Sequence, residues 1–168
     1  AIIVEVVGLE EPNWPRWLLV DRFNTQGLVA DQTDAPLEAA LACYAPIDAL
    51  LPAEGEALRR QRLIMNTAAA LMFHQKWQQA AALLEPLVAR ARLRRRHPVM
   101  RSWTYGNLVS VLVSLGRLGE ARQWLREALP LWRADGIVHV YLHSTMRLLA
   151  AEGRVADAMR LVGAEEVS

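Results

Sequence analysis

The chain is 168 residues long, is 53% hydrophobic and carries a formal net charge of +1. This length suits about one domain with a substantial apolar core, and the near-neutral charge excludes a general attraction to nucleic acid or to a membrane surface. The single cysteine, Cys43, excludes an internal disulfide framework and is compatible with a reducing cytoplasm.

Residues 1–16 precede the helical pattern, and we expect them to form an N-terminal arm or the end of a preceding repeat. Ala1–Val7 is apolar but lacks the basic start and the small-residue cleavage site of a signal peptide. No uninterrupted apolar run approaches the roughly 18 residues needed to cross a bilayer. The chain starts without Met, which suggests a fragment of a longer protein. We therefore expect a soluble, cytoplasmic protein without a membrane partner.

Residues 17–52 are predicted to form a first pair of helices. Small and apolar residues recur at helical spacing on both sides of a loop at residues 32–36. They are Phe23, Gly27 and Ala30 in the first helix, and Leu37, Ala40, Leu41, Tyr44 and Ile47 in the second. Pro36 suits the first turn of a helix, where the missing N–H would have no partner in any case.

Three further helix pairs are predicted over residues 56–96, 99–134 and 137–165. Each begins with an apolar stripe at helical spacing, breaks for a few residues and then starts a second stripe. In the second pair the two stripes are Leu63, Ile64, Ala68, Leu71 and Met72, then Ala80, Leu83, Leu84, Leu87 and Val88. Clusters of helix-breaking residues at 52–55, 97–98 and 134–136 separate the pairs.

A short motif recurs at the break inside each of the last three pairs. It reads Gly116-Arg117-Leu118-Gly119-Glu120-Ala121, Gly153-Arg154-Val155-Ala156-Asp157-Ala158 and, in a degenerate form, Gln75-Lys76-Trp77-Gln78-Gln79-Ala80. The alanines that end the motif are 41 and 37 residues apart, within the range of stacked helical units. The motif therefore predicts an all-α, right-handed solenoid of about four antiparallel helix pairs, which together form one domain over residues 17–168.

The turn motif and the small residues around it resemble the tetratricopeptide repeat. The match is best over Leu108–Ala128, followed by Ala68–Leu87 and Leu149–Val162. The periods are longer than the typical 34 residues, and the strongest proline of the repeat consensus is absent. The resemblance implies that the first helices of successive pairs line a concave face that binds partners.

Two further segments look like the C-terminal sensor region of large bacterial ATPase-type transcriptional regulators, of the winged-helix or LuxR-like kind. They are Glu10-Glu11-Pro12-Asn13-Trp14-Pro15 and Asp157–Ala164. In such proteins a DNA-binding domain and a nucleotide-binding module precede helical repeats. The resemblance implies that this fragment is the sensory or interaction part. It contains no Gly-x-x-x-x-Gly-Lys phosphate loop, so we do not expect it to hydrolyse ATP.

Asn66 and Asn107 are the leading candidates for partner contacts, because they occupy matching places in two first helices. A side-chain amide there offers both a donor and an acceptor to the backbone of an extended peptide, and Asn24 is a candidate third member. In the alternative interpretation each asparagine bonds a neighbouring helix. The other residues predicted for the face are Arg62, Met65, Ala69, Met72, Phe73, Trp103 and Ser110. Methionine and phenylalanine at this spacing are more often core residues.

Other chemistry-bearing clusters favour structural explanations. The arginines of Arg90–His97 suit a solvated helix end, where cations complement the helix dipole. His139 and His143 are one helical turn apart, but no acidic or cysteine ligand accompanies them, so no metal site is predicted. Trp14 and Trp17 are expected to cover the first pair. No catalytic residues are predicted, because no nucleophile and base occur at a diagnostic spacing.

We therefore expect a non-enzymatic domain that binds a protein or peptide and needs no cofactor. Direct binding of nucleic acid by this fragment is not expected. Two alternatives stay open at this point. The concave groove, with an apolar floor and a basic edge, could instead sense an apolar small molecule, or an exposed apolar end could pair with a second copy of the chain.

Overall fold

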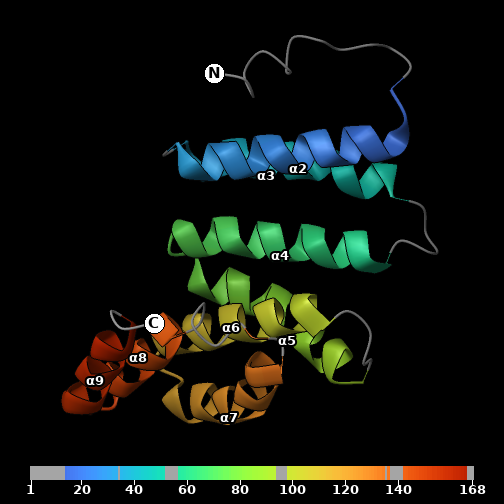
Figure 1. The fold of residues 1–168 in the computed structure, drawn as a ribbon. Helices are drawn as coiled ribbons and strands as arrows, with labels where there is room; N and C mark the ends of the chain where they lie inside the picture. The colour runs from blue at the N-terminus through green and yellow to red at the C-terminus, as the bar shows by residue number, and fades with distance from the viewer. Residues whose placement is uncertain are drawn as a thin grey trace. The chain divides into compact units, whose positions relative to one another are not determined.

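The computed structural model describes residues 14–33, 35–51, 57–93, 98–134, 136 and 142–165, with the side chains of all of these except 31, 32, 91–93, 98–101 and 162–165 (Figure 1). The regular secondary structure of this part of the chain is entirely helical. The helices are α2 Arg16–Gln32, α3 Leu37–Leu50, α4 Ala57–Phe73, α5 Trp77–Leu93, α6 Pro98–Ser114, α7 Leu118–Ala134, α8 Leu142–Ala151 and α9 Val155–Glu165. The all-α class is therefore confirmed for the described residues.

Two described helices lie within, or begin one residue before, each of the ranges 17–52, 56–96, 99–134 and 137–165. We call α2, α4, α6 and α8 the first helices and α3, α5, α7 and α9 the second helices. Contacts join α2 to α3, α6 to α7 and α8 to α9, and also the successive helices α5 to α6 and α7 to α8. Most of the predicted arm at 1–16 lies outside the described residues, as do the breaker positions 52–55 and 97.

The chain divides into two compact units, Ala1–Leu63 and Ile64–Ser168. In the first unit, α2 buries Val20, Asn24 and Gly27 against α3, whose buried residues include Tyr44 and Ile47. Gly27 is needed at this crossing, because a Cβ atom there would lie 2.3 Å from Cε1 of Tyr44. The small residue that the sequence places in the first helix thus lets the two backbones approach.

In the second unit, α6 is the central helix and contacts α5, α7 and α8. From Ser102 to Leu112 every side chain of α6 is buried except those of Trp103 and Asn107. Trp132 of α7 is fully buried, and its Nε1–H donates to the carbonyl oxygen of Ser102 at 3.1 Å. The core of the unit is therefore built around α6 rather than shared equally among the helices.

The three motif turns in the second unit have the same backbone geometry. Gln75, Gly116 and Gly153 have φ of 57°, 73° and 77°, in the left-handed region. The N–H of the following residue donates to the carbonyl oxygen five residues back in each case, at 2.8, 2.9 and 2.8 Å. This is the Schellman arrangement, which satisfies carbonyls at a helix C-terminus. The degenerate motif at Gln75 is thus equivalent to the two glycine turns.

Replacing Gln75 by glycine is expected to stabilise the protein by about 0.5–1 kcal/mol. Gln75 is the non-glycine residue with positive φ in the described chain, and left-handed backbone costs residues other than glycine about 1–2 kcal/mol, of which the greater freedom of glycine in the unfolded chain offsets a part. Urea denaturation followed by circular dichroism measures the change. The matched variant Gly116→Gln should lose stability, since nothing lies within 4 Å of a Cβ there and only the φ preference is changed. Shifts of the same sign in both variants would contradict the expectation.

Candidate functional site

The first helices of the second unit contact one another through side chains. Thr104 of α6 donates from Oγ1 to Sδ of Met65 on α4 at 3.3 Å, in the interior. Between α6 and α8, the hydroxyls of Ser110 and Ser144 are 2.7 Å apart and buried. Nearer the ends of these helices, Arg147 of α8 donates from Nη2 to Oγ of Ser114 at 2.8 Å. The first helices are therefore neighbours in the order α4, α6, α8.

The motif turns that follow α4, α6 and α8 allow equivalent positions on these three helices to be identified. Counting nine residues back from Gln75, Gly116 and Gly153 leads to Asn66, Asn107 and Ser144. Asn66 and Asn107 are half-buried, whereas Ser144 is fully buried against Ser110. Two asparagines thus lie at the same position of neighbouring helices with part of each side chain accessible, and the equivalent position of α8 is closed.

The remaining predicted face residues divide between surface and core. Trp103 and Phe73 are 46% and 54% exposed, and Ala69 and Met72 are half-buried. Met65 and Ser110 are buried, at 4% exposure each, and make the internal contacts described above. We therefore place Met65 and Ser110 in the core, because a neighbouring first helix covers them.

Two predicted residues belong to the first unit. Arg62, in the first half of α4, is exposed and pairs through Nη2 with Oδ1 of Asp21 at 3.4 Å. Asn24 is only 2% exposed on α2, so it lies in the interior of the first unit and not on an accessible face. The accessible candidates in the second unit are therefore Asn66, Ala69, Met72, Phe73, Trp103 and Asn107.

Arginine–carboxylate pairs follow the motif turns. Arg117 donates from Nε and Nη2 to the carboxylate of Glu120 at 2.7 and 2.6 Å, and from Nη1 to Glu85 of α5 at 2.6 Å. Arg154 donates from Nε and Nη2 to a single oxygen, Oδ2, of Asp157, at 2.9 and 2.7 Å. The hydrogen bonds from these arginines lower the pKa of Glu120 and of Asp157. The spacing of arginine and acid within the motif is the signal that would have found them.

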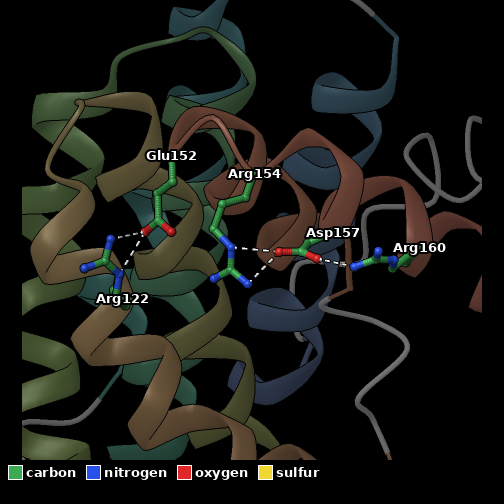
Figure 2. A network of polar contacts seen from close by, with 5 residues as sticks. All are labelled: Arg122, Glu152, Arg154, Asp157 and Arg160. Carbon is green, nitrogen blue, oxygen red and sulfur yellow. Dashed lines mark hydrogen bonds and ion pairs between the residues drawn. The ribbon is translucent and has the colours of Figure 1, made fainter.

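Arg122 of α7 forms an ion pair with Glu152, the residue that follows α8. Its Nε and Nη2 both donate to Oε1 of Glu152, at 2.9 and 2.7 Å. Figure 2 shows this pair beside Arg154, Asp157 and Arg160, where Arg154 and Arg160 approach the two oxygens of one carboxylate. The Glu152 side chain is only 10% exposed, whereas Arg122 is 50% exposed. The ion pair therefore joins a surface cation to a largely buried carboxylate.

Arg122→Ala is expected to destabilise the protein by about 1–2 kcal/mol, because it leaves the Glu152 carboxylate buried without this cation. Adding Glu152→Gln should restore part of the loss, since a neutral amide is less costly to bury. Arg154→Ala is the matched control at a more exposed pair and should change stability less. If both single variants behaved alike in urea denaturation, burial of Glu152 would not be the cause.

The clusters assigned structural roles are only partly described. Arg90 is exposed, and the side chains of residues 91–97 lie outside the described set. His143 is exposed with Nε2 3.4 Å from Oγ of Ser144, and His139 is outside the described residues. Trp14 is half-buried and Trp17 is exposed. Within the described residues no three potential metal ligands come together.

No helix in the described part of the chain has the length and apolar character needed to span a membrane. Comparison with protein-family models, with curated proteins and with solved structures gave no significant match. The resemblance to tetratricopeptide repeats therefore depends on the residues of the sequence motif alone.

Proposed function

We propose that this chain is a non-enzymatic helical repeat domain of the tetratricopeptide type, which binds an extended segment of a partner protein along its first helices. The observation that carries the proposal is the pair Asn66 and Asn107. They share one register position on neighbouring helices, and both are partly accessible. Right-handed stacking of the four pairs into a solenoid is part of the same proposal.

The chemistry of the asparagine pair suits a polypeptide backbone. Each amide can accept from a peptide N–H and donate to a peptide C=O, and backbone groups are present in every segment regardless of its sequence. Hydrogen bonds of this kind contribute about 0.5–1.5 kcal/mol each.

We place the domain in a cytoplasmic bacterial transcriptional regulator, as its sensory or interaction part. The support is the sequence resemblance of residues 10–15 and 157–164 to such regulators. A repeat domain in that setting would convert the binding of a partner into a change at the DNA-binding part.

Self-association is a second candidate function, favoured by α9. Val155 and Met159 lie one turn apart on α9 and are 58% and 63% exposed. On α7 the position equivalent to Met159 is Arg122, which pairs with Glu152, the residue that follows α8. Sedimentation velocity over a range of concentrations, with Met159→Lys as the comparison, tests this second candidate.

The primary proposal is tested with a phage-displayed library of random dodecapeptides selected on the immobilised chain. Peptides that bind the native protein are expected to bind the Asn66→Ala/Asn107→Ala variant about tenfold or more weakly, in line with the loss of at least two hydrogen bonds. Gln78→Ala/Gln79→Ala is the matched control, since it removes two exposed amides from the second helix α5. Enrichment of no peptide, or equal binding to both double variants, would overturn the proposal.

A further inference from the structure

Polar side chains join the α8–α9 pair to the helices α6 and α7. The contacts are Ser110 to Ser144, Ser114 to Arg147 and Arg122 to Glu152. Among the apolar side chains described on α8, Leu148 is buried, at 2% exposure, whereas Met146 and Leu149 are half-buried. Hydroxyl groups and an ion pair therefore provide much of the attachment of this pair to the rest of the second unit.

The attachment of α7 to α6 is different in kind. Both helices have 17 residues, whereas α8 has 10. Trp132 of α7 and Leu108 and Leu112 of α6 are fully buried, and exposing such side chains to water opposes the separation of helices strongly. Serine hydroxyls and the members of an ion pair regain hydrogen bonds in water when they separate. Moving the α8–α9 pair away from α6 is therefore the less costly opening of the second unit.

The two helices of the α8–α9 pair are tied to each other. They contact one another, and at the turn between them the N–H of Arg154 donates to the carbonyl oxygen of Leu149 at 2.8 Å. After the turn, Arg154 and Arg160 both donate to Asp157 (Figure 2). These bonds lie within the pair, so an opening away from α6 and α7 breaks none of them. The pair thus has the properties of a single unit of local opening.

The part of α6 that α8 covers continues the candidate face. Trp103, Asn107, Ser110 and Ser114 are spaced four, three and four residues apart, so they lie along one stripe of the helix. Trp103 is exposed and Asn107 is half-buried, whereas Ser110 is only 4% exposed. Side chains of α8 contact the hydroxyls of both Ser110 and Ser114. The stripe is therefore closed by α8 directly beyond Asn107.

We propose that the α8–α9 pair is an autoinhibitory lid, which opens as one unit and uncovers the hydroxyls of Ser110 and Ser114 for the partner segment. This inference rests on the proposed function, because the segment is the one that Asn66 and Asn107 hold. A hydroxyl both donates and accepts, so the uncovered serines extend the backbone contacts of Asn107. The apparent affinity for the segment then depends on the population of the open state.

A reversible cross-link tests the lid. The hydroxyls of Ser110 and Ser144 face each other across the contact between α6 and α8, so Ser110→Cys/Ser144→Cys places two thiols where a disulfide can form. Cys43→Ala removes the native cysteine from this protein. A fluorescein-labelled peptide from the dodecapeptide selection is expected to bind the oxidised protein about tenfold or more weakly than the same protein after reduction. Equal affinity of the two forms would overturn the inference.

Loosening the lid should have the opposite effect. Arg122→Ala leaves the Glu152 carboxylate without this cation while the lid is closed, so the open state gains population and the peptide should bind about fivefold more tightly. Gly116→Gln is the control, because it strains the turn between α6 and α7 and leaves the contacts of α8 in place. Tighter binding by both variants to the same degree would show that general destabilisation, and not the lid, is the cause.

Hydrogen exchange followed by mass spectrometry tests the opening without any peptide. The amides of α8 and α9 are expected to exchange together and faster than those of α6, and faster still in Arg122→Ala. Exchange of α8 as slow as that of α6 would overturn the lid. Peptides that depend on Asn66 and Asn107 but bind the oxidised and reduced proteins equally would overturn the lid and leave the proposed function standing. A selection that enriches nothing would overturn both.

Discussion

Gly27→Ala is expected to destabilise the protein by about 1–3 kcal/mol, in the direction opposite to the usual effect of alanine in a helix. In a helix interior, alanine is favoured over glycine by about 1 kcal/mol. At Gly27, however, the new Cβ would lie 2.3 Å from Cε1 and 2.4 Å from Cζ of the buried Tyr44 ring. Overpacking of a buried site costs about 1–3 kcal/mol. Urea denaturation followed by circular dichroism measures the change.

The cause can be isolated by removing the ring. In a Tyr44→Ala background the atoms that crowd Gly27 are absent, so Gly27→Ala should become neutral or stabilising by up to about 1 kcal/mol. Such a reversal of sign identifies the contact itself rather than a general intolerance of α2. Stabilisation by Gly27→Ala in the native background would show that α2 and α3 are further apart than described.

Trp132→Ala is expected to lower the free energy of unfolding by about 3–5 kcal/mol, the typical cost of removing a large aromatic side chain from a core. Trp132 is fully buried on α7, and its Nε1–H satisfies the backbone carbonyl of Ser102 on α6. The substitution therefore removes both apolar contacts and an inter-helix hydrogen bond. Equilibrium denaturation should show the loss as a lower midpoint.

Two variants separate the contributions of Trp132. Trp132→Phe keeps an aromatic ring but removes the donor, so about 1–3 kcal/mol of the loss is expected to remain. Trp103→Ala is the surface comparison on α6, where half of the side chain is already in water, and it should cost less than Trp132→Ala. Equal losses at Trp132 and Trp103 would contradict the central position of α6.

The sequence predicts the helices well because their signals are local. Apolar spacing and turn residues indicated helices in the regions where the described part of the chain has them, and the degenerate turn at Gln75 was recognised although it lacks glycine. The positive φ of Gln75 shows that the turn needs a residue in the left-handed conformation. Glycine is the least strained choice for such a position rather than the only one.

The candidate face is harder to predict because accessibility depends on the neighbouring helix. Helical spacing places Met65 and Ser110 beside the asparagines. It does not predict that Thr104 contacts Met65 and that Ser144 contacts Ser110 in the interior. The Arg122–Glu152 ion pair joins residues that are 30 positions apart in the sequence, so helical spacing does not predict it. In contrast, the pairs Arg117–Glu120 and Arg154–Asp157 are visible in the repeated motif.

The equivalence of the turns at Gly116 and Gly153 also has a genetic consequence. Because the backbone leaves both turns with the same hydrogen bonds and nearly the same φ, a deletion of residues 117–153 would join α6 to α9 through a turn of unchanged geometry. An in-frame duplication of the same segment would lengthen the chain by one helix pair in the same way. The length of such a protein can therefore change during evolution by whole units, and the joint itself requires no compensating substitution.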